Sequence, residues 1–129
     1  MSLEPALCPE ASENAYGVVN YNLVLTFGSS SISTYFGGCS VKVARNSAGN
    51  YTGTLPKPYR TLLGFYHGFQ DASGAILFAV IRSETIGTDG KFIFEVVTET
   101  GTATDPTAGD KLFLNLKVAN DILNDKFQV

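Results

Sequence analysis

Apolar and polar residues alternate along much of this chain, with the period of two that is typical of a strand with one buried face. The cleanest alternation runs over residues 111–118. Its inward positions are apolar: Leu112, Leu114, Leu116 and Val118. Three of its outward positions are polar: Lys111, Asn115 and Lys117. Because one face of such a strand is buried, this segment predicts a strand packed on a core.

Similar patterns, each bounded by turn residues, predict further strands at 16–27, 32–36, 40–44, 51–55, 62–70, 75–81 and 92–98. The segment Ala75–Ile81 is nearly all apolar, so we expect it to be a central strand buried on both sides. Asp89-Gly90 supplies the positive φ angles of a type I′ turn and predicts a tight hairpin. Residues 119–126 have room for one helical turn.

Seven to nine short strands at this spacing predict an all-β chain, an antiparallel jelly-roll-like or Greek-key β-sandwich. We expect one domain over residues 16–129 and a flexible, extended N-terminal arm over residues 1–15. The arm carries three glutamates and two prolines and is either a disordered leader or a segment that orders against a partner. It lacks the pattern of a secretory signal, so Cys8 and Cys39 are expected to be free thiols, although a disulfide between them stays open.

The composition of the 129 residues narrows the classes of function. Apolar runs are too short for a membrane-spanning helix, and a net charge of −3 argues against nucleic-acid binding. One His and two Cys give at most three zinc ligands of those types. Only 16% of residues are charged, against about 25% in an average soluble domain. Few charges together with fifteen aromatic residues favour a protein that assembles with others.

Acidic residues are absent from residues 14–70, whereas four basic residues lie there. One interpretation is a basic face that bears aromatic residues and meets an acidic surface of another subunit. Its members would be Lys42, Arg45, Tyr51, Lys57, Tyr59 and Arg60. The alternative is that segments interleave in the sandwich, so that the charges mix in space.

Catalytic patterns are missing from the sequence. His67 is the sole histidine, and no nucleophile-elbow pattern accompanies it. Glu95 and Glu99 are a formal acid–base pair for glycoside chemistry, but a strand face and its exit explain them more simply. The aspartates lack the spacing of an oxygen-cage metal loop. We therefore expect no enzymatic activity, no cofactor and no metal.

The order of segments over Ser40–Asn120 resembles that of small virion proteins of tailed phages. The resemblance is carried by NYTGTLPKPYRTLLGF at 50–65, DGKF at 89–92 and GTATDPTAGDKLFLNL at 101–116. The resemblance lies in the composition and order of these segments, over about two thirds of the chain. It implies an all-β body, often trimeric, that clamps neighbouring major capsid subunits on the outside of the shell, with a terminal arm that adds to a capsid strand.

The resemblance thus implies a head decoration (cement) protein, made in the host cytoplasm and located on the capsid exterior. Its expected partners are the major capsid protein and two further copies of itself, with neither nucleic acid nor membrane. The candidates for capsid contact are Leu3, Pro5, Leu7, Lys42, Lys57 and Arg60. The candidates for self-association are Tyr16, Phe36, Tyr59 and Phe127.

Two other functions stay open, because sandwiches of this kind support many activities. One is a receptor- or carbohydrate-binding head with shallow aromatic grooves near Tyr35, Tyr51 and Tyr59. The other, more distant, is a small lyase or hydrolase that uses His67 or Glu95.

Overall fold

The computed structural model describes residues 11–15, 17–28, 32–37, 41–72 and 74–119. This part of the chain forms nine strands and is all-β, as the alternation predicts. The strands are β1 (Ala11–Ala15), β2 (Val18–Phe27), β3 (Ile32–Gly37), β4 (Lys42–Ser47), β5 (Asn50–Thr54), β6 (Thr61–Gln70), β7 (Leu77–Thr85), β8 (Lys91–Thr98) and β9 (Lys111–Ala119).

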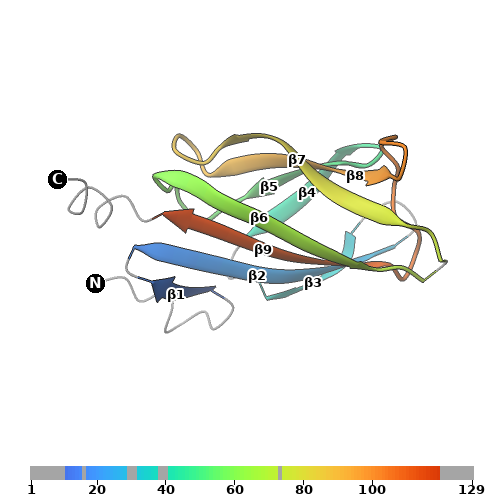
Figure 1. Cartoon of the computed structure of the whole chain (residues 1–129), viewed down its shortest axis with the longest axis horizontal. Coiled ribbons are helices and arrows are strands. Elements are labelled where there is room, and N and C mark those ends of the chain that lie inside the picture. The colour runs from blue at the N-terminus through green and yellow to red at the C-terminus, as the bar shows by residue number, and fades with distance from the viewer. Residues whose placement is uncertain (1–10, 16, 29–31, 38–40, 73, 120–129) are drawn as a thin grey trace.

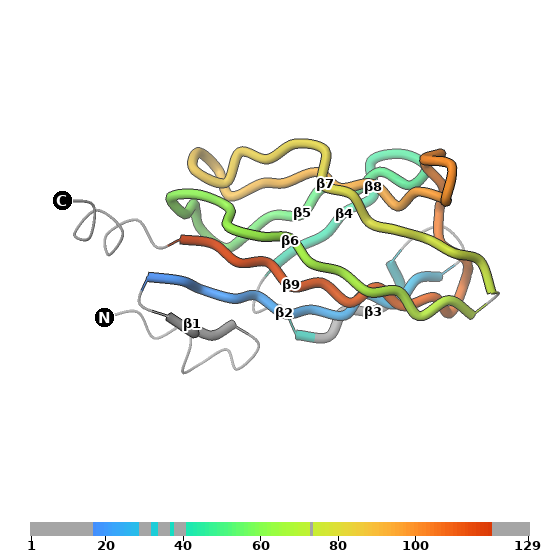
Figure 2. The backbone as a smooth tube through the Cα atoms, in the orientation of Figure 1, coloured from blue at the N-terminus to red at the C-terminus, as the bar shows by residue number. Residues whose placement is uncertain are grey.

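The strands pair antiparallel in two sheets that pack face to face (Figure 1). In the first, sheet A, β9 lies between β6 and β2. The other edge of β2 is shared, since β1 pairs with its first half and β3 with its second half. The second sheet, sheet B, has the order β4-β5-β8-β7. The antiparallel β-sandwich is therefore confirmed, and Figure 2 lets the reader follow the chain between the sheets; the jelly-roll connection stays a prediction.

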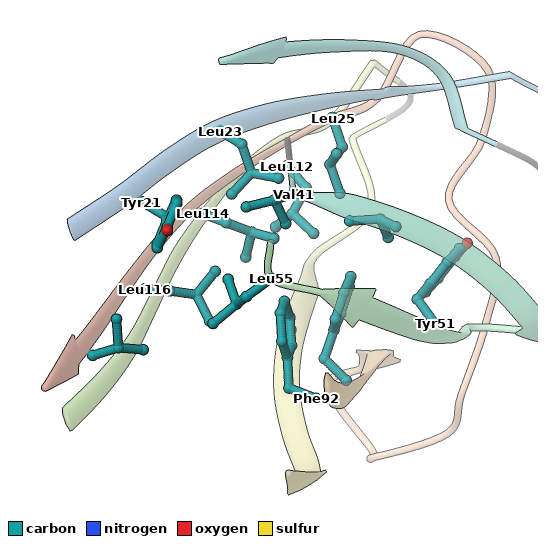
Figure 3. Close-up of a cluster of buried hydrophobic side chains, with 14 of the residues drawn as sticks. Tyr21, Leu23, Leu25, Val41, Tyr51, Leu55, Phe92, Leu112, Leu114 and Leu116 are labelled. Atoms are coloured by element: carbon teal, nitrogen blue, oxygen red, sulfur yellow. The ribbon is translucent and has the colours of Figure 1, made fainter. Parts of the chain in front are cut away.

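The core between the sheets is built from the inward positions of the strands (Figure 3). In β9 the four predicted inward residues are all buried, which confirms the alternation there. Aromatic rings fill the middle: Phe92 and Phe94 of β8 stack at 6.1 Å, and Tyr51 of β5 stacks on Phe94 at 5.4 Å. Such offset stacking adds to the free energy gained by burying the rings.

The prediction that residues 75–81 form a central strand is wrong, because β7 is the outermost strand of sheet B. Ile76 and Phe78 are 55% and 42% exposed. A strand is buried on both faces only when a layer covers each face of its sheet. β7 has only β8 beside it in its sheet, and its outward-facing Phe78 stays in contact with solvent.

The turn at Asp89-Gly90 also differs from the predicted two-residue hairpin. Five residues, 86–90, connect β7 to β8, and the amides of Thr88, Asp89 and Gly90 all donate to the carbonyl of Thr85. Gly90 has a φ of 74°, the left-handed region that glycine adopts without strain. The dipeptide therefore closes a wider loop.

The expected arm is shorter at its inner end than predicted. Residues Ala11–Ala15 form β1, whose Ala11 pairs with Tyr21 of β2, so the sandwich includes them. The remaining arm residues 1–10, both cysteines and the expected helical turn after residue 119 lie outside the described residues.

Candidate interaction face

The outer face of sheet B is closed by a network of polar side chains. Asn46 Nδ2 donates to Asn50 Oδ1 at 2.8 Å and to Thr52 Oγ1 at 2.6 Å. Asn50 Nδ2 in turn donates to Glu95 Oε2 at 3.3 Å, and Arg82 Nε donates to Glu95 Oε1 at 2.7 Å. The hydrogen bond from Arg82 lowers the pKa of Glu95 below its ordinary value. The middle of this face has the polar character expected of a sheet in contact with water, and Phe78 on the edge strand β7 is an exposed apolar residue beside it.

The outer face of sheet A is different, because its central row is apolar. Phe113 of β9 lies between Val24 of β2 and Gly68 of β6 in the strand register. The next row places Asn115 between Asn22 and Tyr66. Phe113 is 42% and Tyr66 is 55% exposed. A large aromatic pair on a solvent-facing sheet is the kind of surface that marks a binding site.

These two rows enclose a groove of about 420 Å³. Its walls include the rings of Tyr66 and Phe113, and Gly68 lies beside them. A Cβ atom built on Gly68 would meet nothing within 4 Å, so the missing side chain leaves this part of the face open. The ring of Tyr66 is held over Gly64, whose added Cβ would lie 2.6 Å from the ring. In β6, Gly68 therefore leaves this part of the groove open, and Gly64 leaves room for the Tyr66 ring to lie against the strand.

The charged residues of β2, β6 and β9 are all basic. The ten residues of β2, the ten of β6 and the nine of β9 include no Asp or Glu. Lys111 and Lys117 lie on the outward side of β9, before and after Phe113. Lys117 Nζ lies 5.8 Å from the centre of the Tyr66 ring, a cation–π contact.

The predicted basic face with aromatic residues forms only in part, because Arg45 and Tyr51 do not belong to it, whereas Lys57 Nζ lies 5.2 Å from the centre of the Tyr59 ring. Arg45 makes a two-bond ion pair with Asp105, at 3.1 and 2.8 Å, so a residue from the acidic half of the chain neutralises it. Tyr51 is buried, and its hydroxyl donates to Asp105 at 3.3 Å. Burial raises the pKa of Tyr51, and the Arg45 hydrogen bond lowers the pKa of Asp105. At this site a basic residue of segment 14–70 lies beside an acidic residue of the later segment, so their charges offset each other.

Three of the predicted capsid contacts lie at one end of the sandwich. Lys42 is exposed at the start of β4 and pairs with Thr54 at the end of β5. Lys57 and Arg60 follow in the crossover from β5 to β6, and the amide of Arg60 donates to Ala119 at the end of β9. The other predicted contacts, Leu3, Pro5 and Leu7, lie outside the described residues.

Tyr59 corrects the predicted self-association set. It is 3% exposed, and its hydroxyl forms a hydrogen bond with that of Tyr21 inside the core. Its apolar ring packs between the sheets, so it offers almost no surface to a second copy; the burial of Tyr51 and Tyr59 likewise removes them from the predicted aromatic sugar grooves. Tyr16, Phe127 and the side chains of Tyr35 and Phe36 lie outside the described part.

The residues considered for catalysis are spread out. His67 lies on β6, where partial burial lowers its pKa, so the imidazole is neutral at pH 7. Glu95 is paired with Arg82 on the outer face of sheet B, and Glu99 is exposed just after β8. No hydrogen bond or ion pair between described residues joins His67 to either glutamate.

Comparisons with protein-family models, with curated proteins and with solved structures found no match. Within the described ranges, no three His, Cys, Asp or Glu side chains gather as a metal site. The same ranges hold no helix long and apolar enough to cross a membrane. Sequence reasoning missed the groove, although one signal for it was present: Phe113 is the outward aromatic residue in the cleanest alternation.

Proposed function

We propose that this chain is a non-enzymatic virion structural protein, a head decoration protein that binds the outer surface of the major capsid lattice. The observation that carries the proposal is the contrast between the two outer faces. Sheet B carries a polar network over the middle of its outer face and one exposed aromatic residue, Phe78, on its edge strand, whereas sheet A presents Phe113 and Tyr66 around a groove. An exposed apolar face on a small sandwich is typical of a protein that acts by docking. The resemblance to phage virion proteins supplies the identity of the partner.

Such a protein stabilises the shell without any chemistry. A ligand that binds only the mature lattice favours that lattice by mass action. A homotrimer would engage several lattice positions at once, and the linked contacts would raise the overall affinity far above that of one. In this proposal the outer face of sheet A makes the main contact with the capsid. Leu3, Pro5, Leu7, Lys42, Lys57 and Arg60 stay candidates for additional contacts.

The test is cosedimentation of the purified chain with expanded capsids that lack it, with unexpanded shells as the control. The proposal predicts saturable binding to the expanded shells and weaker binding to the unexpanded ones. Equal recovery of the chain in the supernatant with and without capsids would overturn it. Light scattering on the same preparation would report the native mass, for which a trimer is expected.

A carbohydrate-binding head is the second candidate, and Tyr66 favours it. The ring is exposed beside two amide side chains, and Asn115 Nδ2 donates to Asn22 Oδ1 at 2.5 Å. An aromatic platform next to amides suits a sugar, which needs an apolar surface and hydrogen-bonding groups. Binding to a host glycan in an array, lost in Tyr66→Ala, would support this function over decoration.

A further inference from the structure

The groove on sheet A is shaped to receive a side chain from outside. The backbone at Gly68 is in an ordinary strand conformation, so glycine is not required there by a turn. It leaves the space beside Phe113 open, and the Tyr66 ring closes the other side. Glycine in a strand interior weakens the strand, and it often marks a place where a ligand or another chain approaches closely.

We propose that this groove binds an apolar side chain of a capsid subunit that is flanked by carboxylates, one opposite Lys111 and one opposite Lys117. This inference rests on the proposed function and adds the chemistry of the partner. The two lysines are six residues apart on the same side of β9, which corresponds to about 20 Å along the strand. Phe113 lies between them, so the apolar contact is central and the charges are at the rim.

Charge complementarity favours this partner over a second copy docked through the same face. The strands β2, β6 and β9 bring two lysines and no carboxylate to their sheet. Two such faces docked on each other would place four lysines in one interface, and like charges in an interface cost several kcal/mol. A carboxylate-bearing surface instead gains attraction at both ends of the groove and a faster encounter.

The first experiment tests whether the groove is open in the free chain. The fluorescent dye ANS binds exposed apolar surface, so we expect it to bind the wild-type chain and to be lost in Gly68→Leu, which fills the hollow. Ala44→Leu, on the exposed outer side of β4, is the matched control. If the wild type excludes the dye and a Leu3→Ser, Leu7→Ser chain admits it, the groove belongs to the N-terminal segment and the proposal is overturned. Dye binding that Gly68→Leu leaves unchanged would also overturn it.

The second experiment measures binding to expanded capsids by cosedimentation. We expect Gly68→Leu and Lys111→Glu, Lys117→Glu each to weaken binding about tenfold or more, with Ala44→Leu and Lys91→Glu as controls that bind normally. The effect of the charge reversal should shrink as salt is raised.

The outcomes distinguish failure of the proposed capsid binding from failure of the inferred groove partner. If the wild-type chain does not bind capsids, the proposed function fails, and this inference fails with it. If the wild type binds and both groove variants bind equally well, only the inference fails. If light scattering shows an oligomer that Gly68→Leu dissociates, the occupant is a second copy and the acidic partner is excluded.

Discussion

Two glycines in strand interiors, Gly53 and Gly68, should respond oppositely to the same substitution. Both have ordinary backbone angles, so alanine introduces no backbone strain at either. At Gly53 of β5 an added Cβ would lie no more than 2.6 Å from three ring carbons of Phe92. At Gly68 of β6 it would meet nothing within 4 Å. We therefore expect Gly53→Ala to destabilise the fold and Gly68→Ala to leave it unchanged or stabilise it.

The magnitude follows from two effects. Replacing glycine by alanine at a compatible position lowers the entropy of the unfolded chain and stabilises by about 0.4–1 kcal/mol. This gain applies equally to both variants. Only Gly53→Ala also overpacks the core, which costs about 1–3 kcal/mol. The Phe92 ring cannot move away easily, because it is fully buried and the centres of the Phe94 and Phe65 rings lie 6.1 and 6.3 Å from its own.

The assay is urea unfolding of the two variants and the wild type, supported by thermal melts. The free energies of unfolding should differ by about 1–3 kcal/mol between the variants, or by about 4 °C in Tm per kcal/mol. In a double-mutant cycle, Gly53→Ala should cost less free energy of unfolding in a Phe92→Leu background than in the wild type, because the smaller side chain makes room for the added Cβ. Equal stability of the two alanine variants would refute the close approach of the Phe92 ring to Gly53.

The remaining predictions concern the polar contacts. Asp105→Asn should lower the free energy of unfolding, because it removes the charge that pairs with Arg45 and weakens the hydrogen bonds that Asp105 accepts from Gly49 and Tyr51. The pKa values of Asp105 and Glu95 are lowered by their partners, so the stability they contribute is present at neutral pH and is lost as pH falls below about 4, visible as an acid unfolding transition. Tyr59→Phe should cost about 1 kcal/mol in urea unfolding by removing the buried hydrogen bond to Tyr21.

Each of these has an outcome that would contradict it. An Asp105→Asn chain as stable as the wild type would mean that solvent already screens the pair. An acid transition that the same variant does not alter would assign the pH dependence to other carboxylates. A Tyr59→Phe chain of unchanged stability would mean that the two hydroxyls are satisfied elsewhere.

The sequence predicted the parts of the fold that depend on local alternation. β9 shows one buried and one outward face along the whole strand, and β8 does so as far as Val96, after which Val97 is buried as well. The position of a strand within its sheet is not local, which is why the apolar start of β7 was misassigned to a sheet centre. The same holds for charge, because the partner of Arg45 is sixty residues away in the chain.

The candidate site was beyond sequence reasoning for a related reason. The groove joins Val24, Gly68 and Phe113 from three strands, and only the register brings them into one row. Tyr59 was a candidate for self-association, yet the crossover from β5 to β6 returns its ring to the core. Register and crossover direction are properties of the assembled sheets, so no pattern in one segment contains them.

In the proposed function, the chain attaches to the capsid through the outer face of sheet A. Electron cryo-microscopy of expanded capsids decorated with the purified chain tests it most directly. We expect β2, β6 and β9 to face the shell, with a capsid side chain beside Gly68 and Phe113. A sandwich attached through sheet B, or only through the end that carries Lys42, Lys57 and Arg60, would contradict it.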